Sequence, residues 1–168
     1  LNFFVLYLME AFLTIVLSIP LYLTYESNFD SIKFLAIVIF LIAIAGETLS
    51  DIQLKKFIEK IKDRTKVCDV GLWKYSRHPN YFFEWLIWIS FSIYGLTSTE
   101  IWPALIPAII MLLLLTKVSG IPLAEESSLK SKKENYINYQ KRTSTFIPWF
   151  PKVLITIIAL MAISNPST

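Results

Sequence analysis

The chain has 168 residues, of which 55% are hydrophobic and only 17% are charged. Soluble domains typically contain about 45–50% apolar and about 25% charged residues, so this composition argues against an ordinary soluble domain. A single cysteine and a single histidine exclude an intramolecular disulfide framework and a cysteine- or histidine-rich metal site. We therefore expect no metal centre. The net charge of +3 is less informative than the positions of the charges.

The first two apolar runs cover residues 3–23 and 32–50, and the apolar face of the second continues to about residue 57. Helical runs of about 20 apolar residues match the thickness of a bilayer core. The first run contains one ionisable residue, Glu10, and is too long and lacks the basic start of a cleaved signal peptide. The chain begins with Leu1 rather than Met, which favours a piece of a longer protein.

The third and fourth apolar runs cover residues 82–96 and 101–118. Pro103 and Pro107 are expected in the first turns of the fourth run, where proline is best tolerated. A final run, residues 153–163, would be only about 16 Å long as a helix, so we expect it to be re-entrant, interfacial or packed on the bundle. These runs predict an all-α, polytopic transmembrane helix bundle with about four spans plus a short C-terminal helix. We expect a single membrane domain over residues 1–168.

The basic residues predict the orientation of this bundle. Of the 16 lysines and arginines, eight lie between residues 55 and 77, seven lie between residues 117 and 152, and only Lys33 is left. Cytoplasmic loops of membrane proteins carry an excess of basic residues. Because four alternating spans put both basic loops on one side, we expect loops 53–80 and 119–150 to be cytoplasmic.

Two pairs of polar residues lie near the ends of the predicted spans. Glu47 and Asp51 are four residues apart, as are Asn80 and Glu84, so each pair shares one helix face. Polar and acidic groups in a membrane span are costly and are functional candidates by default. Both pairs are expected at the same membrane depth, beside the basic loops. The alternative is that they are interfacial residues in contact with water.

The loop before the third run reads GLWKYSRHPNY over residues 71–81. Pro79 favours an extended His78 and suits the first turn of the following helix. The free N–H groups and partial positive charge of that helix start, beside Arg77 and Lys74, predict an anion site. The alternative is that the basic residues only anchor the loop at the membrane surface.

The remaining residues of this loop have simpler interpretations. The aromatic residues Trp73, Tyr75 and Tyr81 are more typical of an interfacial belt than of a stacking platform. Cys68 lies in a charged loop, where we expect it to have no special role.

Three blocks of this sequence resemble a known family. They are GETLSDIQLKKF at residues 46–57, GLWKYSRHPNYFFEW at residues 71–85, and GIPLAEESSLKSKKENYINYQKRTSTFIPWFP at residues 120–151. In this order they resemble a membrane family related to the steroid 5-alpha-reductases and labelled domain of unknown function 1295 (DUF1295). The wider superfamily includes isoprenylcysteine carboxyl methyltransferases and phospholipid methyltransferases, which share the Arg-His-Pro-x-Tyr element.

The reductase resemblance implies that NADPH lies between the helices without a Rossmann fold, and the chain indeed has no G-x-G-x-x-G motif. Residues 46–151 would form the cofactor-binding core of a chain that lacks the N-terminal helices of the family. Asp51 would hold the cofactor, Asn80 and Glu84 would serve its nicotinamide–ribose part, and Arg77 and Lys74 would meet its phosphates. The implied cofactor-binding residues are Glu47, Asp51, Lys74, Tyr75, Arg77, His78, Asn80, Tyr81, Glu84, Glu126, Tyr136, Tyr139 and Arg142.

Two positions qualify this resemblance. Phe83 stands where these families usually have a glycine, so its ring would either narrow the pocket or change the helix packing. The resemblance assigns no catalytic acid. Glu10 is the candidate, and an interhelical hydrogen bond is its alternative role.

We therefore expect an integral membrane oxidoreductase that uses NADPH to reduce an activated C=C bond in a steroid- or lipid-like substrate. The alternative is an S-adenosylmethionine-dependent methyltransferase of the isoprenylcysteine type, although the loop GLTSTEIWP lacks the Asn-Pro usual in those enzymes. A third interpretation is a non-enzymatic structural or lipid-binding subunit. A transporter is disfavoured, because the polar groups gather at one face. The expected partners are the lipid bilayer and a lipophilic small molecule, with no nucleic acid.

Overall fold

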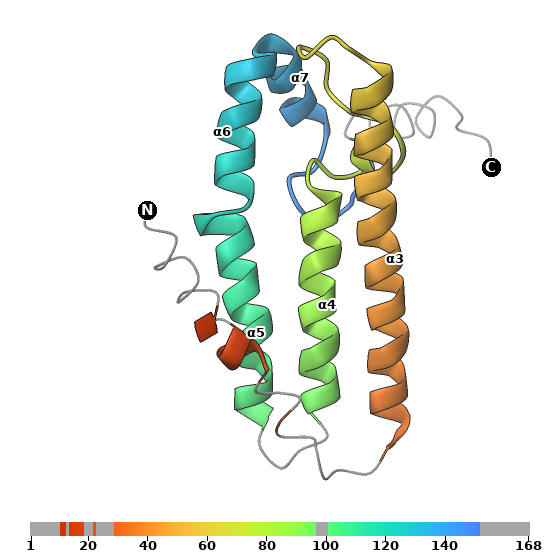
Figure 1. The fold of residues 1–168 in the computed structure, drawn as a ribbon, viewed down its shortest axis with the longest axis vertical. Helices are drawn as coiled ribbons and strands as arrows, with labels where there is room; N and C mark the ends of the chain where they lie inside the picture. Colours follow the sequence, from red (N-terminus) through yellow and green to blue (C-terminus); the bar gives the residue numbers. More distant parts are fainter. Residues whose placement is uncertain (1–10, 13, 19–21, 23–28, 97–100, 152–168) are drawn as a thin grey trace, which may run out of the picture. The chain divides into compact units, whose positions relative to one another are not determined.

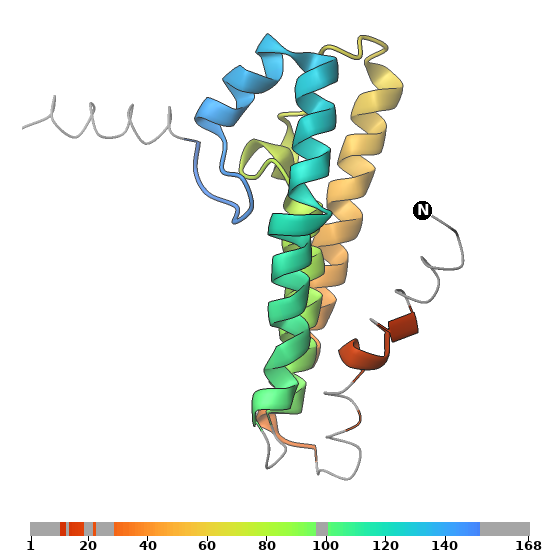
Figure 2. The ribbon, with the colours of Figure 1, turned by 90° about the vertical axis from the view of Figure 1, so that its left-hand side faces the viewer.

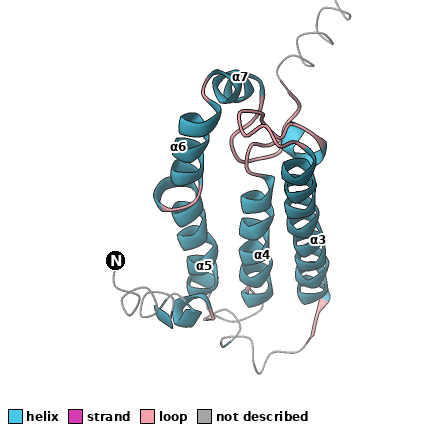
Figure 3. Cartoon of the chain, turned by 45° about the horizontal axis from the view of Figure 1, so that its top comes forward, coloured by secondary structure: helices cyan, strands magenta, loops and turns pink. Residues whose placement is uncertain are grey.

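The computed structural model describes residues 11–12, 14–18, 22, 29–96 and 101–151. In this part of the chain every regular element is a helix, as predicted, and Figure 3 shows these helices joined by loops. In chain order they are α3 (Ser31–Lys60), the 3-10 helix η1 (Gly71–Lys74), α4 (Pro79–Gly95), α5 (Ile101–Leu113), the π-helix η2 (Leu114–Val118), α6 (Ile121–Lys132) and α7 (Glu134–Arg142).

Helix α3 is longer than the apolar run that predicted it. It begins after Asp30, whose carboxylate accepts a hydrogen bond from the Lys33 backbone N–H at 2.9 Å. It then continues unbroken for 30 residues to Lys60 (Figure 1). At 1.5 Å per residue it is about 45 Å long, which exceeds the roughly 30 Å core of a bilayer. The charged turns after residue 54 are therefore helical rather than a loop.

Helix α4 begins at Pro79, as predicted from the fixed φ of proline. The Ser76 hydroxyl accepts a hydrogen bond from the His78 N–H at 3.1 Å, and the His78 carbonyl accepts one from Phe82 N–H at 3.1 Å. The residues before the proline thus satisfy the backbone groups at the helix start.

The fourth predicted run, residues 101–118, corresponds to α5 and the π-helix η2. Pro107 is the seventh residue of α5 and lies inside the helix, within its first two turns as expected. Helix α6 follows after Gly120, with Pro122 in its first turn. Lys133 then adopts a positive φ of 46°, and α7 folds back from α6 there (Figure 2). The polar segment 125–145 is therefore largely helical.

In the part of the chain that the structure describes, two helical stretches are long and apolar enough to cross a membrane, Ser31–Lys60 and Ala104–Lys132. Large apolar side chains on α3 are exposed in the described part of the chain, including Phe34 at 60% and Leu41 at 60%. Contiguous exposed apolar surface of this kind marks a membrane or protein contact. The first predicted span with Glu10, the loop 97–100 and the final run 153–163 lie largely or wholly outside the described residues.

The chain divides into two compact units, the first Leu1–Ile44 with Glu84–Leu115 and the second Ala45–Phe83 with Thr116–Thr168. In the first unit, the Phe40 and Phe91 rings lie 5.5 Å apart, and Trp85 Nε1 donates to the Ala108 carbonyl at 3.0 Å. The candidate cofactor site consists entirely of residues of the second unit.

Candidate cofactor site

The second unit encloses a cavity of about 180 Å³. Its walls come from the second half of α3, the loop that leads to α4, the first turn of α4, and the inner faces of α6 and α7. The lining residues are Leu54, Val67, Cys68, Trp73, Arg77, His78, Asn80, Tyr81, Ala124, Ser128, Lys132, Tyr136 and Tyr139. Six of the 13 predicted cofactor residues are among them, namely Arg77, His78, Asn80, Tyr81, Tyr136 and Tyr139.

The loop before α4 is held against α3 by two hydrogen bonds. Gln53 Oε1 accepts one from Leu72 N–H at 2.8 Å, and Trp73 Nε1 donates one to the Ser50 carbonyl at 2.9 Å. Gly71 makes this approach possible, because its φ is +57° and a Cβ there would lie 2.4 Å from Gln53 Oε1. The cavity wall is therefore anchored to a long helix.

Arg77 ties the loop to the C-terminal part of the second unit. Its side chain is buried, with 8% exposure. Its Nε donates to Glu125 at 2.8 Å, Nη1 donates to the Gln140 carbonyl at 2.9 Å, and Nη2 donates to Thr145 Oγ1 at 2.7 Å. Each guanidinium nitrogen thus has an acceptor within the chain. This arrangement gives Arg77 a positioning role, whereas the sequence predicted a contact with phosphate.

Glu125 is the acceptor at the centre of this network. Its Oε1 lies 2.7 Å from Arg77 Nη2 and 3.4 Å from His78 Nε2, and its Oε2 accepts a hydrogen bond from Gln140 Nε2 at 2.9 Å. Sequence reasoning selected its neighbour Glu126 instead. The positions 121, 125, 128 and 132 follow the helical period and form the inner face of α6, so this periodicity could have identified Glu125.

His78 contacts Glu125 Oε1, whereas Gln140 contacts Oε2, and the His78 ring stacks on Tyr81 with centroids 5.5 Å apart and planes 9° apart. Burial lowers the pKa of His78 from 6.5 to about 4, although Glu125 opposes this shift. The imidazole is therefore neutral at pH 7. A neutral ring offers one donor and one acceptor nitrogen to its surroundings.

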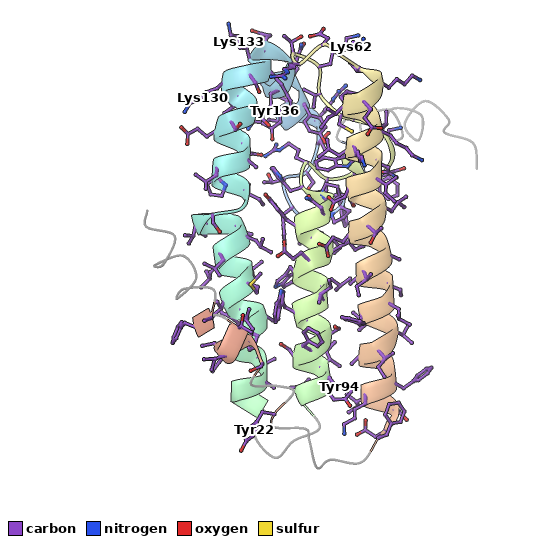
Figure 4. The ribbon with its side chains drawn as sticks, in the orientation of Figure 1. Tyr22, Lys62, Tyr94, Lys130, Lys133 and Tyr136 are labelled. Carbon is purple, nitrogen blue, oxygen red and sulfur yellow. The ribbon has the colours of Figure 1, made fainter. Side chains whose placement is uncertain are left out.

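The two tyrosines of α7 close the cavity. Tyr139 is 1% exposed, and its hydroxyl donates to the Trp73 carbonyl, with Ser76 O at 3.3 Å. Tyr136 is 3% exposed and lies on the inner side of α7 (Figure 4). Burial raises the pKa of Tyr136 to about 12 and raises the pKa of Tyr139 as well. Both phenols keep their protons at neutral pH and act as hydrogen-bond donors.

Asn80, the second residue of α4, presents an unusual buried atom to the cavity. Its Oδ1 has less than 1 Å² of accessible surface and has no hydrogen-bond partner among the residues that the structure describes. Leaving a buried acceptor unsatisfied costs about 1–3 kcal/mol. Such an atom in a cavity wall is explained most simply by a donor on a bound molecule.

Cys68, Trp73 and Tyr81 all lie in the cavity wall. Cys68 is buried in the cavity wall at 4% exposure, and burial raises the pKa of its thiol. Trp73 is buried at 8% rather than part of an interfacial belt, because its indole N–H reaches the α3 backbone. Tyr81 stacks in the cavity. Only Tyr75 is exposed, with its ring edge against Phe150.

The other predicted site residues do not line this cavity. Lys74 and Asp51 are exposed, and Glu47 is half-buried on α3. Glu84 belongs to the first unit. Tyr75 is exposed beside Phe150. The expected convergence of two polar pairs is therefore represented in the cavity by Asn80 alone.

The last two predicted residues form ion pairs away from the cavity. Glu126 accepts a hydrogen bond from Lys130 at 2.6 Å, and Figure 4 shows Lys130 pointing outward from α6. Arg142 pairs with Asp69 and lies 6.0 Å from the centre of the Tyr139 ring. Both residues therefore form ion pairs at the surface of the second unit and not in its interior.

Phe83, which departs from the family pattern, changes the helix packing. A Cβ on Gly46 would lie 2.4 Å from the Phe83 ring, so the glycine on α3 makes room for the ring on α4. Phe83 does not line the cavity.

Within the described residues, the fold and the site define a helical protein with two helices of membrane-spanning length and a cavity lined by both apolar and polar side chains. Residues 1–143 match the sequence model of a family described as "Protein of unknown function (DUF1295)". The chain belongs to this DUF1295 family, as the three sequence blocks predicted. No curated protein and no solved structure matches the chain.

Proposed function

We propose that this protein is an integral membrane oxidoreductase that binds NADPH and reduces an activated C=C bond in a lipophilic substrate. The observation that carries the proposal is the buried, unpartnered Oδ1 of Asn80 in the wall of the cavity. A nicotinamide carboxamide and its ribose carry N–H and O–H groups that such an acceptor requires.

The other groups of the cavity support the same ligand. Asn80 Oδ1 suits the amino group of the carboxamide, whereas the Tyr136 hydroxyl in the same wall is engaged with Glu125 and Ser128. The cavity of about 180 Å³ is smaller than the roughly 300–1,000 Å³ typical of sites for drug-sized ligands. It would therefore hold one end of a dinucleotide, with the rest of the molecule outside it.

When bound, NADPH supplies a hydride to the β-carbon of a polarised enone. The residues of this chain would orient the cofactor and control protons around it. Glu125 and Arg77 fix the loop that carries His78 and Asn80. The buried His78 and Tyr136 are neutral and therefore add no charge to the cavity.

A lipophilic substrate fits the surfaces of the first unit. That unit contains an apolar cavity of about 210 Å³ lined by Ala36, Ile37, Phe40, Ser90, Phe91 and Tyr94. Within a four-span topology, the bias of basic residues supports a cytoplasmic location for loops 53–80 and 119–150. The cofactor cavity would then face the compartment that supplies soluble nucleotides.

The alternative is an S-adenosylmethionine-dependent methyltransferase. The small size of the cavity favours this compact cofactor, because a single nucleoside would fill more of it than a dinucleotide would. The unpartnered acceptor of Asn80 suits an amino group equally well.

The test is calorimetric titration of the purified full-length protein in detergent with NADPH and, separately, with S-adenosylmethionine. We expect binding of NADPH only, and we expect Asn80→Ala to weaken it by about tenfold, since one hydrogen bond is lost. Asn138→Ala, at an exposed position of α7, is the matched control and should bind normally. Binding of S-adenosylmethionine without NADPH would overturn the reductase proposal.

A further inference from the structure

A second cavity lies beside the candidate cofactor site in the same unit. Its volume is about 340 Å³, and it lies among the last turns of α3, the loop after α3 and the end of α6. It shares three wall residues with the first cavity, namely Leu54, Cys68 and Lys132. The two cavities are therefore separated by little more than these side chains.

The wall of the second cavity combines apolar and cationic side chains. Phe57, Ile58 and Ile61 supply apolar surface, whereas Arg64, Lys66 and Lys132 supply positive charge. Among the described residues of this wall, Asp63 alone carries a carboxylate. We refer to Arg64, Lys66 and Lys132 as the cationic rim. Apolar surface together with this rim is chemically suited to a nucleotide base and its phosphate.

The Asp63 carboxylate is already used by its own turn. It accepts hydrogen bonds from the Thr65 N–H at 2.9 Å and from the Thr65 hydroxyl at 2.7 Å. These two hydrogen bonds lower the pKa of Asp63. Among the described residues, no ion pair includes Arg64, Lys66 or Lys132. The positive charge of the rim is thus not neutralised by a neighbouring carboxylate in direct contact.

The cationic rim is also held in place. Asn135, at the start of α7, donates a hydrogen bond from Nδ2 to the Thr65 carbonyl at 3.0 Å. The Lys132 ammonium lies 5.6 Å from the centre of the Tyr136 ring and 3.4 Å from Ser128 Oγ. Lys132 therefore lines both the candidate cofactor cavity and the second cavity. A preorganised rim costs less to order when a ligand binds.

We infer that the second cavity binds a phosphate-bearing adenosine part of the cofactor, with Lys132 and Arg64 as the phosphate ligands. This inference rests on the proposed function, because it extends the same ligand from one cavity into the next. Lysine and arginine are the usual partners of phosphate groups. S-adenosylmethionine carries no phosphate, so a phosphate site here would separate the two candidate functions.

The experiment uses adenosine 2′,5′-bisphosphate and adenosine as probes of this cavity alone, with the full-length protein in detergent. We expect the bisphosphate to bind at least about tenfold more tightly than adenosine, and its affinity to fall as salt screens the charges. Lys132→Gln and Arg64→Gln should each weaken the bisphosphate by about five- to tenfold. Lys130→Gln, on the outer side of α6, is the matched control and should leave its affinity unchanged.

A second measurement guards against misfolding of the variants. Cys68 is the single cysteine of the sequence and lies in the walls of both cavities, so a small thiol reagent should label it slowly and specifically. The bisphosphate should slow this labelling in the unmodified protein, and Cys68→Ser provides the background. Loss of protection in Lys132→Gln, with protection retained in Lys130→Gln, would support the inference.

The outcomes separate this inference from the proposed function. Equal weakening of NADPH and NADH by Lys132→Gln would assign the site to the pyrophosphate, and weakening of NADPH alone would assign it to the 2′-phosphate. Lysine-dependent bisphosphate binding in a protein that does not bind NADPH would keep the phosphate site and reject the reductase. Equal affinity for bisphosphate and adenosine, or displacement of the bisphosphate by micellar phosphatidic acid, would overturn the inference.

Discussion

The neighbouring residues Glu125 and Glu126 provide the sharpest test of the site geometry. They are chemically identical and adjacent on α6, yet Glu125 joins the buried network and Glu126 pairs with Lys130 at the surface. Replacing Glu125 by alanine leaves Arg77, which is 8% exposed, without its carboxylate partner. It also removes the acceptor of the Gln140 amide.

The expected cost follows from these contacts. Removing one partner of a buried ion pair costs about 3–5 kcal/mol. Glu125 retains 18% exposure, and Arg77 keeps its backbone acceptors, so we expect the lower end, about 3 kcal/mol. For a chain of this size that corresponds to a fall of about 6–12 °C in Tm.

The assay is thermal unfolding of the purified full-length protein in detergent, at one scan rate for all variants. Glu125→Ala should lower Tm strongly, and Glu126→Ala should leave it unchanged because its ion pair is exposed to solvent. The double variant Arg77→Leu with Glu125→Leu should recover part of the loss, since it leaves no unpaired buried charge. Equal effects of Glu125→Ala and Glu126→Ala would refute the inward placement of Glu125.

Three further predictions concern stability. The pKa of His78 is 6.5 in the unfolded chain and about 4 in the folded one, so the neutral ring contributes up to about 3 kcal/mol of folding stability above pH 6.5, and this contribution is lost as the pH falls toward 4. Between pH 6.5 and 4, Tm should therefore fall less in His78→Gln than in the unmodified protein. Identical dependence of Tm on pH in the two proteins would contradict the lowered pKa. Gly46→Ala should lower the free energy of unfolding by about 1–3 kcal/mol, because the new methyl group clashes with the Phe83 ring. Adding Phe83→Ala to this variant should restore part of the lost Tm, and a double variant with no such recovery would argue against the contact. Gly71→Ala should cost about 1–2 kcal/mol for its positive φ, beyond any clash with Gln53, and an unchanged Tm would exclude the left-handed turn.

Features that depend on short stretches of chain were predictable from the sequence. The apolar runs identified α3, α4 and α5, because burying or dissolving a helix in lipid requires a continuous apolar segment. Pro79 identified the start of α4, because proline restricts its own φ and the residue before it. The three sequence blocks identified the family and contain all the residues that line the cavity except Val67 and Cys68.

The tertiary structure decided which of the predicted polar residues meet. Arg77 finds its acceptors 48 to 68 residues later in the chain, and no local pattern specifies such partners. The choice between Glu125 and Glu126 depends on the rotation of α6, which is set by packing. Cys68 and Lys132 line both cavities because the folded chain brings their distant segments together, with a chain reversal at Lys133. Local sequence determines helices through backbone and solvent preferences, whereas a site depends on long-range contacts that only the folded chain provides.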